Sequence, residues 1–300
     1  MEERRRWCIF TSVGDKNAIR SWLENATPRQ WDLVSAYYGS NDDEFSYIRK
    51  ESSYAFRTKG SKFQNLKKLV IERPQLFDKY SYICVCDDDI QMSTAQIEEI
   101  FSIVETFGFW VAQPGFHPKG KISHAITCST WPQWDFRIVN YIEVTMPIFR
   151  SDKFAEFLAV YDGGLVGWGI DHWFSNFFKA NDFGRFAIID KIRVINPRDS
   201  QKGAREIDRL QSAVRRSEAW EKFRGAHGLV EYPHKVFSYG KLAPKNDLYA
   251  ETIPTRGLPL AQRILVLLRV IARTSWREAI WLIKCGMTTR RQWRRTVKSR

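Results

Sequence analysis

The sequence YSYICVCDDD occupies residues 80–89 and changes abruptly from apolar residues to three consecutive aspartates. Its first part is short, apolar and rich in aromatic and β-branched residues, which predicts a buried strand. Successive side chains of a strand point to opposite faces, so Asp87 and Asp89 would lie on one side and Asp88 on the other. Ligands of open α/β sheets bind just outside the carboxyl ends of the strands. The aspartates are therefore predicted to lie where such a sheet binds its ligand.

The sequence after this strand predicts a helix. Ser93 and Gln96 form a capping-box pattern, and apolar residues follow at helical spacing from Ile97 to Val104. Similar patterns predict strands at residues 7–13, 31–38, 109–113, 141–150 and 185–195, and helices at residues 15–24, 62–71, 151–161, 171–180 and 201–224. This alternation predicts βαβ units, and thus an α/β fold in which a mostly parallel mixed sheet is flanked by helices.

The composition is that of a globular chain. The 300 residues are 44% apolar and 27% charged, which excludes collagen-like, low-complexity and wholly disordered proteins. Five scattered cysteines lack the spacing of a zinc site, so we expect free thiols in a reducing compartment. The apolar stretch near the N-terminus is too short for a secretory signal, and no window is long enough to span a membrane. We expect a cytoplasmic protein with one domain at residues 1–245.

The C-terminal segment, residues 252–300, differs from this domain in charge. Residues 251–300 contain 12 Lys or Arg and 2 Asp or Glu, a surplus of +10, whereas the first 250 residues contain 35 and 32, a surplus of +3. A predicted amphipathic helix carries a polar stripe at Gln262, Arg269, Arg273, Arg277 and Lys284. Its many Leu and Ile residues favour an anionic surface on the inner face of the membrane, bound through residues 258–300, over nucleic acid. Alternatively, the apolar face packs on the domain and only the stripe is exposed.

The aspartate triplet is a candidate metal site. Two carboxylates on one side of a strand end, Asp87 and Asp89, can hold a hard divalent cation such as Mg²⁺ or Mn²⁺. Such a cation would neutralise the charge that develops on a leaving diphosphate. The alternative is a solvated acidic turn before the next helix, where acidic groups are favourable.

Two further stretches contain candidate binding residues. Residues 167–172 read GWGIDH, and Asp171 can act there as a general base on a hydroxyl, or else stabilise the N-terminus of a helix. His172 is a candidate base or a surface histidine, and Trp168 can stack on a sugar or pack in the core. Lys59 and Lys62 can contact phosphates or a ribose, although solvated lysines are the default interpretation and the Walker spacing is absent.

In combination these motifs resemble glycosyltransferases of the GT-A fold, where a strand ending in Asp-x-Asp holds the metal and the nucleotide-sugar diphosphate. The chain is similar, more closely still, to one glycosyltransferase-like family, domain of unknown function seven-zero-seven. The likeness spans roughly residues 11–198 and keeps the family's order of motifs. These motifs are Val13-Gly14 with Lys16-Asn17, Asp87-Asp88-Asp89, Ala112-Gln113-Pro114, Glu143 to Pro147, Trp168-Gly169-Ile170-Asp171 and Ile188-Ile189-Asp190.

The resemblance implies a GT-A-like, Rossmann-like domain that transfers a sugar from a nucleotide-diphospho-sugar donor to a glycan or lipid-linked acceptor. Asp87 and Asp89 would hold the Mn²⁺ or Mg²⁺, and Asp88 would lie near the ribose or sugar of the donor. The resemblance further implies Val13, Gly14, Lys59 and Lys62 for the nucleotide, Trp168, Gly169 and His172 for the acceptor side, and Asp171 as the base of an inverting reaction.

One position departs from the pattern of the family. Related sequences often carry a histidine that serves as a late metal ligand, where this chain has Asn196 and Pro197. His227 and His234 are the candidate replacements. Two other functions stay open at this point. One is a metal-dependent phosphatase of the haloacid dehalogenase type, which Gln91 disfavours because that type has Thr or Val at this place. The other is a non-catalytic module that binds a membrane surface.

Overall fold

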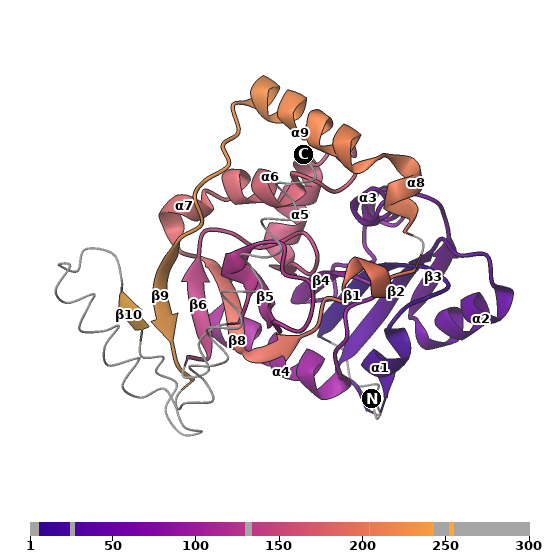
Figure 1. The fold of residues 1–300 in the computed structure, drawn as a ribbon. Helices are drawn as coiled ribbons and strands as arrows, with labels where there is room; N and C mark the ends of the chain where they lie inside the picture. The colour runs from indigo at the N-terminus through magenta and orange to yellow at the C-terminus, as the bar shows by residue number, and fades with distance from the viewer. Residues whose placement is uncertain (1–5, 25–27, 130–133, 204, 243–251, 255–300) are drawn as a thin grey trace.

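The structure is a computed structural model of the full chain, and it describes residues 6–24, 28–129, 134–203, 205–242 and 252–254. Figure 1 shows a central sheet with helices packed on both of its faces. Within the described residues, no helix is both long enough and apolar enough to cross a membrane. The amphipathic helix predicted within residues 258–300 lies outside the described residues.

The strands of the described chain form one sheet in the order β10-β9-β6-β8-β5-β7-β4-β1-β2-β3. Their bounds are β1 Trp7–Val13, β2 Trp31–Tyr37, β3 Tyr54–Arg57, β4 Tyr82–Asp87, β5 Val111–Phe116, β6 Phe136–Val139, β7 Ile148–Arg150, β8 Phe186–Val194, β9 Val236–Gly240 and β10 Thr252–Pro254. β6, β7 and β10 run antiparallel to their neighbours, and the other strands run in one direction. The predicted α/β class with a mostly parallel mixed sheet is therefore confirmed.

The helices cover the apolar side chains of the two sheet faces. Their bounds are α1 Ile19–Leu23, α2 Asp42–Glu51, α3 Lys62–Glu72, α4 Thr94–Phe107, α5 Ser151–Val160, α6 Ile170–Phe177, α7 Ala180–Phe183, α8 Glu206–Leu210 and α9 Ala213–His227. On one face, Cys84 and Cys86 of β4 pack in a core with residues of α1 and α4. On the other face, Ile83 and Val85 pack with residues of α3, α5 and α6. The alternation along β4 thus follows the period of two that its sequence predicts.

Residues 141–150 do not form the single strand that the sequence predicts, because only Ile148–Arg150 is a strand. Pro147 has no N–H to donate to a ladder. The carbonyl groups of Val144 and Thr145, just before it, accept hydrogen bonds from Lys62 Nζ. Asp87 N–H donates to the carbonyl of Thr145 at 2.9 Å, and Lys62 Nζ donates to the same carbonyl at 2.9 Å. Residues 140–147, the β6–β7 loop, therefore lie beside the end of β4.

Residues 201–224 were expected in one helix, and the structure has two. The Ser212 side chain accepts a hydrogen bond from Arg215 N–H and so begins α9 as its N-cap. The sequence patterns did not predict α2 or β3. Ile48 is the one buried residue of α2, so this surface helix lacks the apolar stripe from which helices are recognised.

Asp190, in the last of the family-like motifs, has a structural partner. Arg137 Nε donates to Asp190 Oδ2 at 2.6 Å, and Arg137 Nη2 donates to Asp190 Oδ1 at 2.9 Å. Both side chains are buried, so each charge depends on the other for compensation. The pair connects β6 to β8 and thereby holds the second half of the sheet together.

Candidate active site

The β1 and β4 strands end side by side, and this brings Gly14 to the aspartate triplet. The two strands are parallel, with Ser12 opposite Asp87. One residue further, Gly14 N–H donates to Asp88 Oδ2 at 2.7 Å. A Cβ on Gly14 would lie 2.6 Å from Tyr38 Oη, so a larger residue here would require the Tyr38 ring to move. The sequence-predicted residues Val13, Gly14 and Asp88 therefore meet at the carboxyl edge of the sheet.

Asp88 lies in an unusual electrostatic environment. Asp88 is buried, with 9% of the residue exposed. Burial, together with the negative charges of Asp89 and Asp87, raises the pKa of Asp88 to about 8, and the Gly14 hydrogen bond opposes this rise. The charge of this carboxyl group is thus sensitive to any cation that comes to the site.

Lys62 has its ammonium group inside the protein. Lys62 Nζ donates to Asp87 Oδ1 at 2.7 Å and to the carbonyl of Val85 at 3.0 Å, besides the carbonyls of the β6–β7 loop. It neutralises Asp87 and ties that loop to the end of β4. Lys59 Nζ donates to the carbonyl of Tyr38 at the same edge of the sheet. The nucleotide contacts expected of these two lysines remain predictions, and the contacts described here are internal to the protein.

Asp89 has a partner that the sequence patterns did not predict. Lys202 Nζ lies 2.9 Å from Asp89 Oδ2 and donates to Asn196 Oδ1 at 2.9 Å. Burial and the charge of Asp87 raise the pKa of Asp89, and Lys202 opposes the rise. Nothing in the sequence around Lys202 indicates this contact, because Asp89 is distant in the chain and the two meet only in the fold.

The fit of the triplet to a divalent cation can be judged from its oxygen atoms. Asp89 Oδ1 is buried and has no hydrogen-bond partner in the described part of the chain, and an unpaired buried carboxylate oxygen is costly. Among the described residues, no group of three or more His, Cys, Asp or Glu side chains could hold a metal ion. Mg²⁺ and Mn²⁺ prefer oxygen ligands, and Mg²⁺ sites commonly take only one or two protein carboxylates, with phosphate and water completing the shell. Asp87 and Asp89 therefore fit such a cation as its two protein carboxylates, with water or phosphate left to complete the shell.

Asp171 lies at the start of α6, after a glycine in the left-handed region. Gly169 has φ of 90°, and a Cβ there would lie 2.3 Å from the Trp220 ring. Asp171 is 6% exposed, and its carboxylate accepts hydrogen bonds from Tyr141 Oη at 2.7 Å and from His172 N–H at 3.0 Å. Trp168 remains exposed at 42%. The four predicted acceptor-side residues therefore lie together in the chain segment that leads into α6.

Aromatic and histidine rings surround Asp171 from distant parts of the sequence. Tyr141 Oη is 3.0 Å from His124 Nε2, and the His234 ring stacks on Tyr141 at 4.4 Å between centroids. The His172 ring stacks on Trp220 at 5.6 Å. Sequence reasoning missed Tyr141 and His124 because the loops that contain them contact α6 only in the folded chain.

The β6–β7 loop connects the aspartate triplet to Asp171. At one end, Thr145 accepts from Asp87 N–H, and Thr145 Oγ1 donates to Glu143 Oε1 at 2.8 Å. At the other end, Tyr141 donates to Asp171. Glu143 is itself buried, and its N–H donates to Gln113 Oε1 at 2.6 Å. One short loop therefore contacts both predicted sites and fixes them relative to each other.

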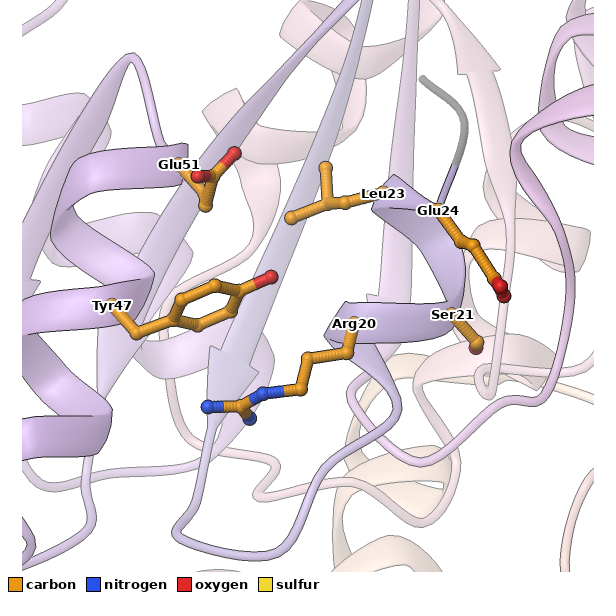
Figure 2. Close-up of a pocket in the computed structure, with 6 residues that line it drawn as sticks. All are labelled: Arg20, Ser21, Leu23, Glu24, Tyr47 and Glu51. Atoms are coloured by element: carbon orange, nitrogen blue, oxygen red, sulfur yellow. The ribbon is translucent and has the colours of Figure 1, made fainter.

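A separate pocket lies between α1 and α2 (Figure 2). Its volume is about 440 Å³, and it is lined by Arg20, Ser21, Leu23, Glu24, Tyr47 and Glu51. Arg20 is already paired with Glu44 at 2.8 Å and lies over the Tyr47 ring. None of the sequence-predicted site residues lines this pocket, so it is not the candidate active site.

Several solved structures are similar to this chain in backbone structure. GalNAc-T7 with UDP, GalNAc and Mn²⁺ has a TM-score of 0.48 and 13% identity, over 76% of this chain and 55% of that one. S. aureus TarS has a TM-score of 0.48 and 10% identity, over 74% of each chain. TarS in complex with UDP-GlcNAc has a TM-score of 0.46 and 10% identity, over 74% and 72%. At these values the likeness does not decide what this chain binds.

The chain spans about half of GalNAc-T7. Neither a family model nor a curated protein matches the sequence, so the resemblance to domain of unknown function seven-zero-seven remains an expectation.

The packing of the His234 ring near Asp171 predicts how the free energy of unfolding depends on pH. Burial, with His124 and His172 nearby, lowers the pKa of His234 from 6.5 to about 4. As the pH falls from 6.5 to 4, the unfolded chain takes up a proton that the folded chain does not, so the free energy of unfolding should fall. NMR titration of the ring, assigned with His234→Gln, should give a midpoint near 4. A midpoint near 6.5, or an unchanged pH dependence of unfolding in His234→Gln, would contradict this packing.

Proposed function

We propose that the chain is a glycosyltransferase that moves a sugar from a nucleotide-diphospho-sugar donor to a glycan or lipid-linked acceptor. The observation that carries the proposal is the hydrogen bond from Gly14 N–H to Asp88 at the carboxyl edge of β1 and β4. It brings a bare backbone segment next to three carboxylates, and the β6–β7 loop joins both to a buried fourth carboxylate, Asp171. We assign the triplet and Gly14 to a donor half of the site and Asp171 to an acceptor half.

In the donor half, the nucleotide would lie against Val13 and Gly14 at the end of β1. Asp88 would accept hydrogen bonds from the ribose or the sugar. Asp87 and Asp89 would hold Mn²⁺ or Mg²⁺, which supplies positive charge against the leaving diphosphate. Without positive charge, the carboxylates would repel an anionic donor.

In the acceptor half, Asp171 is the candidate general base. It would take the proton of the acceptor hydroxyl as the new bond forms between that oxygen and the anomeric carbon, while the bond from this carbon to the diphosphate oxygen breaks. Burial, with the charge of Asp171, raises the pKa of Tyr141, so Tyr141 stays a neutral donor that orients the carboxylate. Trp168, with its exposed ring, is available to a sugar face.

The connection between the two halves favours a transferase over a phosphatase. Phosphate release needs only the triplet and a water molecule. Here a second carboxylate is buried and oriented by Tyr141 and by the His172 N–H, which supports a separate place for an acceptor hydroxyl.

Titration of UDP, GDP and ADP with and without Mn²⁺ tests this assignment by calorimetry. We expect wild type to bind one of them more tightly with Mn²⁺, and Asp89→Asn to lose about 10-fold or more of the metal-dependent affinity. Asp171→Asn should bind this nucleotide like wild type, because it lies on the acceptor side. Asp78→Asn, an exposed aspartate, is the matched control. Failure of all three nucleotides to bind wild type, or wild-type binding by Asp89→Asn, would refute the proposal.

The membrane partner of residues 258–300 also stays a proposal, with a cytoplasmic protein held at the inner face of a membrane. The full chain should float with anionic vesicles and not with neutral ones, because the segment is cationic. Absence from both vesicle types would refute membrane association.

A further inference from the structure

The side chain of Lys202 is almost entirely buried beside Asp89, in the donor half of the candidate active site. Lys202 follows the short 3₁₀ helix Asp199–Gln201, and its side chain is 6% exposed. Its ammonium group lies 2.9 Å from Asp89 Oδ2 and 2.9 Å from Asn196 Oδ1. Burying a lysine is costly unless it is paired, so these two contacts fix where the positive charge lies.

Backbone contacts hold Asn196 and Asp89 in register. The Gln91 N–H donates to the carbonyl of Ile195 at 2.9 Å, and the Ile195 N–H donates back to Gln91 at 3.1 Å. The Asn196 carbonyl accepts from Lys121 N–H at 2.7 Å. The end of β8 is thereby attached to the residues directly after the triplet. The two partners of the Lys202 ammonium group are therefore held in place by backbone hydrogen bonds.

The charges of the site show what this ammonium group can do. Asp87 already has Lys62 as its internal partner at 2.7 Å, but Lys62 donates to four oxygens of the protein. An ammonium group has three N–H donors, and Lys202 uses two of them on Asp89 and Asn196. Of these two lysines, Lys202 is the one with a donor left for an anion.

We propose that Lys202 is the built-in cation of the donor site. Its ammonium group shares Asp89 with the divalent cation, and its third N–H binds the diphosphate of the donor. The inference rests on the proposed function, because it is the proposed function that assigns a diphosphate to the carboxyl edge of β1 and β4. It has two consequences. A nucleoside diphosphate binds weakly even without metal, through Lys202, and metal and ammonium compete for the carboxylate of Asp89.

The first consequence is tested by titrating UDP, GDP and ADP into the full chain in EDTA. We expect Lys202→Met to lose roughly 10-fold or more of the metal-free affinity, as for a lost hydrogen bond to a charged group. Lys202→Arg keeps the charge and should retain part of the affinity. Lys191→Met is the matched control, since Lys191 pairs with Glu99 at 2.7 Å on the surface. Metal-free binding that is equal in wild type and Lys202→Met would overturn the inference.

The second consequence is tested with Mn²⁺ alone, by following the signal of free Mn²⁺ in electron paramagnetic resonance. Lys202→Met should bind Mn²⁺ more tightly than wild type, because like charges no longer compete at Asp89. Lys191→Met should not differ from wild type. Equal or weaker Mn²⁺ binding by Lys202→Met would overturn the shared position.

The two proposals fail in different ways. If wild type binds no nucleoside diphosphate with or without Mn²⁺, the proposed function fails, and the diphosphate role of Lys202 fails with it. If wild type binds a nucleoside diphosphate with Mn²⁺ and Lys202→Met behaves identically in both experiments, only the role of Lys202 is wrong. Unfolding midpoints of both variants by circular dichroism identify any loss of the fold.

Discussion

The hydrogen bond between Gly14 N–H and the Asp88 carboxylate is the contact on which the candidate site depends. It forms because β1 and β4 are parallel neighbours that end at the same level of the sheet. It gives a buried carboxyl group one fixed donor in the turn that follows β4. The close packing of Gly14 on Tyr38 means that a side chain at this position would displace the Tyr38 ring.

Charge compensation is the second constraint. Three adjacent carboxyl groups at one strand end repel each other, and burial increases this repulsion. Two lysines compensate this charge. Lys62 from α3 pairs with Asp87, and Lys202 from the segment after β8 pairs with Asp89, so both neighbours of Asp88 have a cationic partner. Lys62 donates to four oxygens of the protein, so its role is structural. Lys202 has two such contacts and therefore an N–H that can bind an anion.

The sequence predicted the parts of the site that are local and missed those that need the folded chain. The apolar run before Asp87 predicted β4, and Gly14, which the family resemblance assigns to the nucleotide, lies beside Asp88 in the structure. Lys202, Tyr141 and His124 carry no local signal, because their partners come from other loops. The strand predicted over residues 141–150 is confirmed only at Ile148–Arg150, because the preceding carbonyl groups accept hydrogen bonds from β4 and from Lys62.

The central claim is that the carboxyl edge where β1 and β4 end binds a nucleoside diphosphate. A crystal structure of the full chain with bound UDP, GDP or ADP tests it most directly. The account predicts electron density for the diphosphate beside Asp89 and Lys202, with the nucleoside against Gly14. A nucleotide bound instead in the pocket between α1 and α2, or anywhere away from this edge, would contradict the account.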